Sequence, residues 1–213
     1  MNSLFTFYIY FDYIFIMRTL IIIPVLLFSL LLGVPSYSAD FNKGVIAAQN
    51  GDWATALKEW KPIAEEGNAA AQFNLGLMYQ NGYGVPQDYK ESVYWYRLAA
   101  EQGDADSQYN LGVMYERGYG VSKDDKEAVN WYRLSAEQGL TDAQYNLGFM
   151  YNNGKGVPTD KVYAYMWFNI AAANGDKDAE EKRNKLNKTL SQSQIEEAQR
   201  LSRECVKKNY KGC

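Results

Sequence analysis

The chain contains no histidine, and it has only two cysteines and five prolines among its 213 residues. Without histidine, Ser–His–Asp and Cys–His catalytic arrangements cannot form, and the commonest metal-binding side chain is missing. No Ser-x-x-Lys motif occurs in the repeated part of the chain either. We therefore predict a protein that is not an enzyme and that uses no metal or other cofactor.

A concentrated positive charge is also missing. The 22 lysines and arginines are scattered among 25 aspartates and glutamates, which gives a formal net charge of −3. Proteins that bind nucleic acids gather Lys and Arg on one face, because these residues meet the phosphates. The sequence therefore predicts no nucleic-acid partner.

The two cysteines, Cys205 and Cys213, lie close together near the end of the chain. In an oxidising compartment they could pair and close a small loop. The alternative is that Cys205 packs as a small apolar residue while Cys213 frays with the tail. The spacing leaves both open.

The first 38 residues have the pattern of a secretory signal. Met17 and Arg18 give a short positive start, residues 19–33 are almost entirely apolar, and small residues stand at Ser36 and Ser38. This order is typical of a peptide that is cleaved during export. We expect cleavage after Ser38 and a mature protein in the periplasm or outside the cell.

Residues 1–16 are aromatic-rich and carry no basic residue. We interpret Met17 as the true start of the protein. The alternative is a genuine extension that makes a longer, uncleaved membrane anchor, and only in that case would the chain associate with a membrane.

The remaining chain carries a 36-residue period. Six residue types return in the same order in three successive units. They are Gln72, Asn74, Leu75, Gly76, Met78 and Tyr79, then Gln108, Asn110, Leu111, Gly112, Met114 and Tyr115, then Gln144, Asn146, Leu147, Gly148, Met150 and Tyr151. A fixed period of this length indicates a solenoid, in which each unit buries its apolar face only against its neighbours.

Each unit predicts a helix, a glycine-rich turn and a second helix. In the first full unit, residues 69–80 are rich in helix formers, and the segment 81–86 contains two glycines and a proline that end the helix. Asp88 with Glu91 three residues later has the spacing of a capping box, so the second helix begins there and runs to about residue 102. Gly103 then stands where a C-terminal cap is expected.

A glycine also lies inside each first helix, at Gly76, Gly112 and Gly148. Glycine costs about 1 kcal/mol relative to alanine in this setting. We expect a close approach of the second helix, which a Cβ would block. Retention by chance after duplication is the alternative.

The segments 71–79, 82–85 and 95–103 resemble Sel-1-like repeats, which are relatives of the tetratricopeptide repeat. The resemblance covers 69–104, 105–140 and 141–176, and residues 39–68 are similar to a divergent first repeat. It implies an all-α fold, a right-handed α/α superhelical solenoid of helix–turn–helix repeats. It also implies a scaffold or adaptor protein, although the family's partners are diverse.

Residues 177–213 no longer follow the repeat, and we expect them to form capping helices and a tail. Ile195, Ala198, Leu201 and Cys205 make a narrow apolar stripe on one predicted helix. Such a stripe suits a helical cap over the last repeat, which would otherwise expose its apolar face. The stripe could instead dock a partner.

The first helices of successive units are expected to line the concave side of the solenoid, as in tetratricopeptide relatives. Their positions between the core residues then form a partner-binding groove. These positions are Phe73, Leu77, Gln80 and Asn81, then Tyr109, Val113, Glu116 and Arg117, then Tyr145, Phe149, Asn152 and Asn153. Aromatic and amide side chains of this kind suit recognition of a peptide. The alternative is that the column of Phe73, Tyr109 and Tyr145 only completes packing between repeats.

Three functions follow from this pattern. The first is an exported adaptor that binds a peptide or protein in the groove. The second is a cell-wall scaffold that binds peptidoglycan strands through its tyrosines and tryptophans. The third, from the resemblance alone, is a protein that binds or hydrolyses β-lactams, and nothing in the residues supports it. We predict the first.

Overall fold

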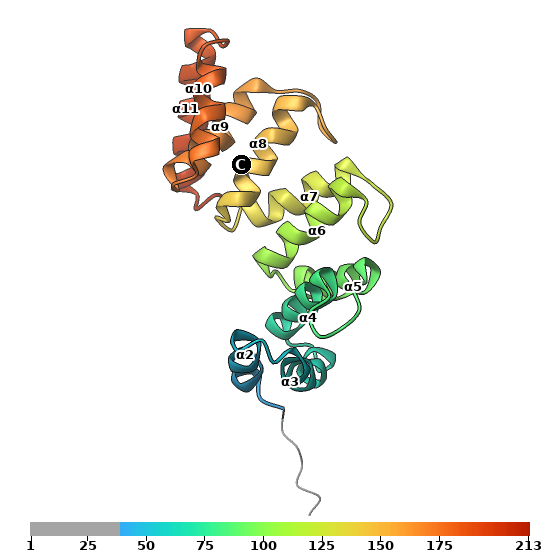
Figure 1. Cartoon of the computed structure of the whole chain (residues 1–213). Coiled ribbons are helices and arrows are strands. Elements are labelled where there is room, and N and C mark those ends of the chain that lie inside the picture. Colours follow the sequence, from blue (N-terminus) through green and yellow to red (C-terminus); the bar gives the residue numbers. More distant parts are fainter. Residues whose placement is uncertain (1–38) are drawn as a thin grey trace, which may run out of the picture. The chain divides into compact units, whose positions relative to one another are not determined.

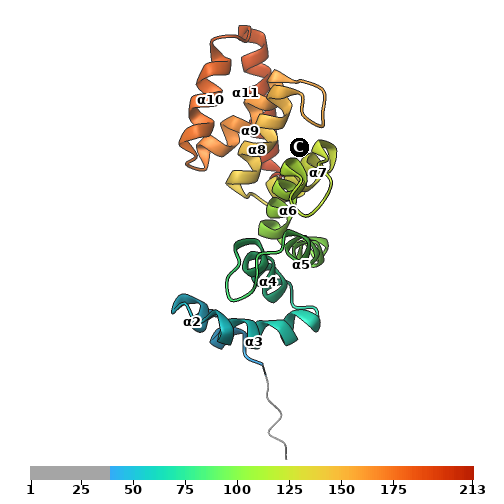
Figure 2. The ribbon, with the colours of Figure 1, turned by 45° about the vertical axis from the view of Figure 1, so that its right-hand side comes forward.

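The computed structural model describes residues 39–213, and within them it contains ten helices and no strand. The helices follow one another in chain order from α2 to α11 (Figure 1; Figure 2 shows a second view). They are α2 (Phe41–Gln49), α3 (Trp53–Glu65), α4 (Ala69–Asn81), α5 (Tyr89–Glu101), α6 (Ala105–Arg117), α7 (Asp125–Ala136), α8 (Thr141–Asn153), α9 (Lys161–Ala173), α10 (Lys177–Asn187) and α11 (Gln192–Lys207). The predicted all-α solenoid of helix pairs is confirmed.

Local signals fix where the helices of a repeat begin and end. The Asn68 side chain accepts the N–H of Ala71 at 2.9 Å and starts α4, and Gly82, at φ 72°, ends it in the left-handed conformation. The Asp88 carboxylate then accepts two N–H groups at the start of α5. The sequence therefore predicts these boundaries to within one residue.

The capping box predicted at Asp88 does not form. Its second half requires Glu91 to accept the N–H of Asp88. That N–H instead donates to the carbonyl of Tyr79 at 2.9 Å. The same bond recurs in the next repeat, from Asp124 to Tyr115 at 3.0 Å, because the glycine-rich turn brings the chain back against the end of the first helix.

The glycines inside the first helices mark the closest contact between the two helices of a repeat. A Cβ on Gly76 would lie 2.5 Å from the ring of Tyr96, and one on Gly112 would lie 2.7 Å from the ring of Tyr132. Neither distance is compatible with a real Cβ. The predicted close approach is confirmed.

Buried glutamine side chains connect each repeat to the preceding one. The Nε2 of Gln72 donates to the carbonyl of Ala64 at 3.0 Å, and its Oε1 accepts a bond of 2.7 Å from Gln102. Gln108 repeats both contacts, with Ala100 and Gln138. Because a buried amide must be hydrogen-bonded, this side chain fixes how one repeat sits on the next.

At the C-terminal end, α10 and α11 both pack on α9. Ala198 and Cys205 are buried in this contact, and Ile195 and Leu201 lie partly buried beside them. The apolar stripe of α11 thus covers the last repeat. Cys205 forms a disulfide with Cys213, which holds the tail against the core cluster that contains Leu147 and Trp167.

The expected signal peptide and the start at Met17 lie outside the described residues. Within 39–213, none of the helices has the length and apolar character needed to cross a membrane.

Candidate protein-interaction surface

The twelve predicted groove residues lie on α4, α6 and α8, four on each, and we call them the first-helix face. None of the twelve is fully buried: Asn81, Arg117 and Asn153 are exposed, and the other nine are half-buried. By contrast, Leu75, Leu111 and Leu147 on the same helices are fully buried. The first-helix face is therefore a surface that recurs in three consecutive repeats.

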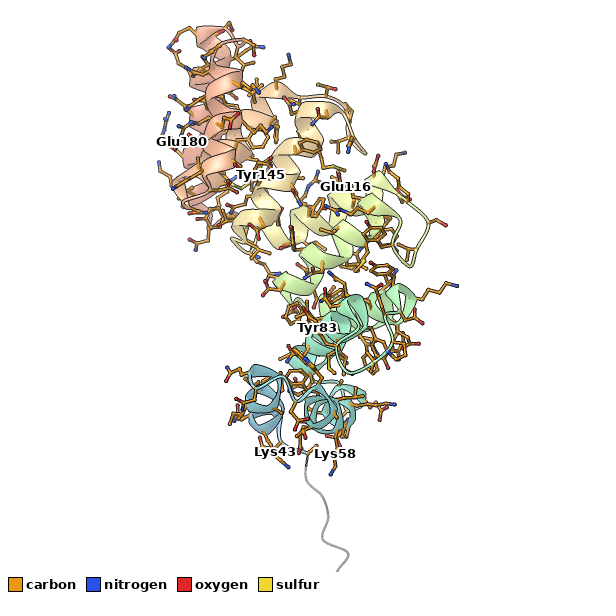
Figure 3. The ribbon with its side chains drawn as sticks, viewed as in Figure 1. Lys43, Lys58, Tyr83, Glu116, Tyr145 and Glu180 are labelled. Carbon is orange, nitrogen blue, oxygen red and sulfur yellow. A yellow bond between two sulfur atoms is a disulfide. The ribbon has the colours of Figure 1, made fainter. Side chains whose placement is uncertain are left out.

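Its aromatic column packs on the second helix of its own repeat. The ring centroids of Phe73 and Tyr96 are 6.0 Å apart, and those of Tyr109 and Tyr132 are 5.9 Å apart. Tyr145 lies 5.6 Å from Phe168 in the same way, and Figure 3 labels it on α8. Each ring has one side in the core and keeps part of its surface exposed.

The aliphatic and aromatic positions one turn further on contact the next repeat. Leu77 packs against the core cluster that contains Leu111, and Val113 packs against the cluster that contains Leu147. Packing between repeats is thus part of the role of Leu77 and Val113. The half-buried state leaves the remaining surface for contact with a partner.

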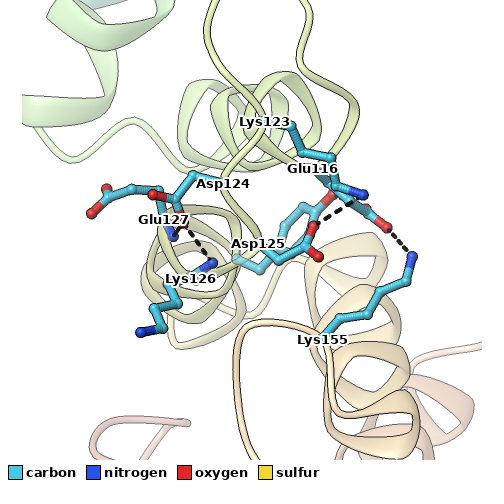
Figure 4. Close-up of polar contacts among 8 residues, drawn as sticks. Glu116, Lys123, Asp124, Asp125, Lys126, Glu127 and Lys155 are labelled. Atoms are coloured by element: carbon cyan, nitrogen blue, oxygen red, sulfur yellow. Dashed lines mark hydrogen bonds and ion pairs between the residues drawn. The ribbon is translucent and has the colours of Figure 1, made fainter.

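The third position of the face on each of the first two helices, Gln80 on α4 and Glu116 on α6, forms hydrogen bonds within the fold. The Tyr96 hydroxyl donates to Gln80 Oε1 at 2.8 Å. The Tyr132 hydroxyl donates to Glu116 Oε2 at 2.9 Å, and Lys155 Nζ donates to Glu116 Oε1 at 3.2 Å (Figure 4). Gln80 and Glu116 are therefore occupied by the fold.

Asn81 and Asn153 are the most accessible amides of this face. Each donates its Nδ2 to the carbonyl four residues earlier, at 2.9 Å for Asn81 and 2.8 Å for Asn153. Asn153 Oδ1 also accepts a bond of 3.4 Å from Asn152 Nδ2, whereas no hydrogen bond to Asn81 Oδ1 is present within the described residues. Arg117 stands at the equivalent place on α6 and is exposed as well.

Sequence reasoning missed a row of polar residues beside the first-helix face, which includes Asp142 and Asn146 next to Tyr109. Burial raises the pKa of the Tyr109 hydroxyl, the charge of Asp142 raises it further, and a hydrogen bond with Asn146 acts in the opposite direction. Asp142 and Asn146 belong to α8, so the rows of α6 and α8 meet here. Asn110 and Asn146 recur with the period, but we used them only as markers of the repeat.

Carboxylates gather at the start of these helices. The pKa of Asp106 is raised, first by burial and then by the charges of Asp104 and Asp142. The pKa of Tyr145 is likewise raised by burial and by the charge of Asp178. No salt bridge joins Asp106, Asp142 or Asp178 to a cation within the described residues. This edge of the face therefore carries negative potential.

Within residues 39–213, no set of three or more Cys, Asp or Glu residues is placed to hold a metal ion.

Comparisons with known proteins agree with this architecture. The model of the Sel1 repeat family matches residues 69–104, 105–140 and 141–176, just over half of the 213 residues. Among solved structures, c5321, a protective antigen of uropathogenic Escherichia coli strains with an SLR fold, is 33% identical over 78% of this chain, with a TM-score of 0.69. A Sel1 repeat protein from Oxalobacter formigenes is 29% identical over 78% of this chain, with a TM-score of 0.68.

The chain spans 40% of the length of c5321 and 75% of the length of the Oxalobacter protein. The comparison with curated proteins gave no match.

Proposed function

Because the chain belongs to the Sel1 repeat family, whose members are generally non-catalytic scaffolds for protein–protein interaction, we propose that it is an exported adaptor that binds a peptide segment of a partner protein on the first-helix face. One observation carries the proposal. The same face recurs on α4, α6 and α8 with none of its twelve side chains fully buried. A face repeated in this way suits a ligand that is itself repetitive, such as an extended polypeptide.

Amides at the ends of the first helices suit an extended chain. Asn81 is exposed and donates only through its Nδ2, so its amide oxygen can accept a backbone N–H group of such a ligand.

The charge of the face favours basic side chains in the partner. Asp106 and Asp142 lie close enough for the charge of Asp142 to raise the pKa of Asp106, and Asp178 continues the row on α10. A cation beside them would relieve this repulsion. We therefore expect Lys or Arg in the bound segment and an affinity that falls with salt.

The start of the folded unit is compatible with export. Asp40 caps α2, and its N–H donates to Glu59 Oε2 at 3.0 Å. The mature chain expected after cleavage at Ser38 would keep these contacts.

The test is a crosslinking pulldown from cells that express the tagged protein, with mass spectrometry of the partners and of the protein's own N-terminus. The groove variant is Tyr109→Ala with Tyr145→Ala, and the matched control is Tyr94→Ala, which removes an exposed tyrosine from α5. Because Tyr109 and Tyr145 also pack in the fold, Arg117→Glu serves as a second groove variant at an exposed position. Thermal unfolding must show that each variant is folded.

We expect a mature N-terminus at Ala39 and a defined protein partner that both groove variants lose and the control retains. A partner retained by both groove variants would place the binding surface elsewhere. Capture of peptidoglycan without a protein partner would replace the adaptor by a glycan-binding scaffold. An intact N-terminus would contradict cleavage after Ser38 but would leave the adaptor function standing.

A further inference from the structure

A pocket of about 320 Å³ lies beside the last repeat, between α8, α9 and α10. Three lysines line it, Lys161 from α9 and Lys182 and Lys185 from α10. Asn152 and Thr189 add polar groups, while Phe168 and Leu186 are almost completely buried behind it. Positive charge is therefore concentrated at one point of a protein whose formal net charge is −3.

The equivalent places in the earlier repeats are filled by internal hydrogen bonds. Tyr96 bonds to Gln80, and Tyr132 bonds to Glu116. In the third repeat the tyrosine is replaced by Phe168, which has no hydroxyl, and the partner position holds the shorter Asn152. Within residues 39–213, the only hydrogen bond of the Asn152 side chain is the one that its Nδ2 donates to Asn153 Oδ1, at 3.4 Å. The internal polar pair is lost at the one repeat where the lysines gather.

The lysines also interrupt the repeat pattern. Counted by the 36-residue period, Lys182 stands where α8 carries Asn146, and Lys185 stands where α8 carries Phe149. Lys161 corresponds to Asp125 of the preceding repeat. Each replacement adds a positive charge to the same pocket.

Carboxylates near this pocket leave most of the charge uncompensated. Asp160 uses its carboxylate to cap the start of α9. Glu181 pairs with Lys185 at 3.9 Å, and both side chains are mostly exposed, so this pair is weak. No salt bridge to Lys161 or Lys182 is present in the described part of the chain.

We propose that this pocket binds an organic dianion, a phosphate monoester, whose charged group is held by the three ammonium groups and whose organic part lies against Phe168. Lysine binds phosphate as a point charge, and two or more uncompensated ammonium groups favour a dianion over a monoanion. The volume is at the lower end of the range for small-molecule sites, so there is room for a phosphate and one small apolar group. The pocket shares Asn152 with the first-helix face, but phosphate binding does not rest on the proposed peptide binding and can be tested without the peptide partner.

Isothermal titration calorimetry of the 39–213 protein with phenyl phosphate is the test, because residues 39–213 form one compact unit. Inorganic phosphate, phenylacetate and phenol report the anion alone, a monoanion and the neutral ring. We expect phenyl phosphate to bind more tightly than all three, with an affinity that falls with salt. Lys182→Gln should weaken binding about tenfold, the effect of losing one charge-assisted hydrogen bond. Lys126→Gln, which removes an exposed lysine from α7, should leave it unchanged.

A second variant uses the protein's own repeats. Asn152→Glu with Phe168→Tyr installs the pair found in the second repeat, and it should abolish binding while keeping the fold. Equal loss in Lys126→Gln and Lys182→Gln would show general charge attraction and overturn the site, as would undetectable binding of phenyl phosphate. A phosphotyrosine pentapeptide that binds more tightly than phenyl phosphate would assign the phosphate to a partner protein. Equal or weaker binding would assign it to a free small molecule.

Discussion

The glycine-rich turn of each repeat contacts the second helix of the preceding helix pair, and we call each of these three contacts a seam. The side chains at a seam differ between parts of the molecule. In the two N-terminal seams the contact is aromatic. Tyr83 stacks on Trp53 with ring centroids 4.5 Å apart, and Tyr119 stacks on Tyr89 at 4.9 Å. In the third seam the equivalent residues are Lys155 and Asp125.

The third seam is ionic. Lys155 Nζ lies 3.2 Å from Glu116 Oε1 and 5.0 Å from the ring centroid of Phe149. Asp125 Oδ1 lies 3.6 Å from Lys123 Nζ, an ion pair without a hydrogen bond (Figure 4). Charged side chains thus replace a ring stack at the same place.

The backbone contact is nevertheless the same in the second and third seams, and it is looser in the first, where a Cβ on Gly84 would lie 2.6 Å from the Cβ of Trp53 and 3.1 Å from its carbonyl oxygen. Gly84, Gly120 and Gly156 have φ angles of 68°, 70° and 68°. An added Cβ on Gly120 would strike the carbonyl of Tyr89, and one on Gly156 would strike the carbonyl of Asp125. The glycine backbone therefore sets the distance between repeats, and the side chains around it can be exchanged.

The largest effect is expected from adding a methyl group at this contact. Gly156→Ala places a Cβ against the carbonyl of Asp125 and forces a left-handed conformation on alanine. We expect a loss of about 3 kcal/mol in the free energy of unfolding, and the same loss for Gly120→Ala in the aromatic seam. Urea-induced unfolding measures both.

The control is Gly103→Ala. Gly103 also has a positive φ, 95°, but no atom lies within 4 Å of its added Cβ. Its cost is that of the backbone conformation alone, about 1–2 kcal/mol. If Gly156→Ala cost no more than Gly103→Ala, the backbone contact would not set the seam.

The next effect concerns the acceptor at the ionic seam. Glu116→Leu leaves the buried Tyr132 hydroxyl without an acceptor and Lys155 without its partner. We expect a loss of about 2 kcal/mol in the free energy of unfolding. Glu116→Gln is the matched control, since Gln80 accepts the equivalent hydroxyl at 2.8 Å. It should cost less than about 1 kcal/mol, and equal losses would contradict an acceptor role.

The period alone predicts most of the fold. It aligns Gly76, Gly112 and Gly148, so one argument about a missing Cβ applies to Gly76 and Gly112 and, less tightly, to Gly148, where an added Cβ would lie 3.0 Å from the ring of Phe168. The period fails to predict hydrogen bonds that depend on a contact between separate elements and not on the local sequence. Glu91 has the spacing of a capping box, but the carbonyl of Tyr79 already holds the N–H of Asp88, and no local pattern shows this.

The candidate surface was less predictable from the sequence. The pattern predicts which residues of the first helices remain accessible, but it does not reveal how their second contacts form. Glu116 and Lys155 are 39 residues apart and meet only because the next repeat turns back. The lysine pocket likewise needs α10 to pack on α9 in the register of the repeats, although its sequence has left the repeat pattern.

A smaller effect concerns the stability of the repeats at alkaline pH, to which their buried tyrosines contribute differently. Burial raises the pKa of Tyr96, and burial together with the charge of Glu116 raises that of Tyr132. A folded-state pKa above the unfolded value of about 10 means that the folded chain holds these protons more tightly. Their contribution to stability is full below pH 10 and is lost as the pH rises above it.

Tyr132→Phe tests this. It should cost about 1 kcal/mol at neutral pH and should reduce the loss of stability above pH 10, measured by thermal unfolding over a pH series. Tyr96→Phe should behave alike. The third repeat already has Phe168 here, so Phe168→Leu serves as a control that leaves the alkaline slope unchanged. An unaltered slope in Tyr132→Phe would contradict the raised pKa.

The smallest effect is expected from converting the ionic seam into an aromatic one. Asp125→Tyr with Lys155→Tyr restores the stack that joins Tyr89 and Tyr119. The stack contributes about 1 kcal/mol, and the lost ion pairs offset up to the same amount, so the net change should be below about 1 kcal/mol. The two single variants should each be less stable than the double variant, because each leaves one residue without its partner.

The salt dependence should change more than the stability: the melting temperature of the double variant should respond less to added salt than that of the parent protein. Arg200→Gln is the control, because it removes ion pairs on α11, far along the chain from this seam. The response of its melting temperature to added salt should match that of the parent protein. If the double variant were much less stable than both single variants, the side chains would be part of what sets the seam, and the glycine contact would not suffice.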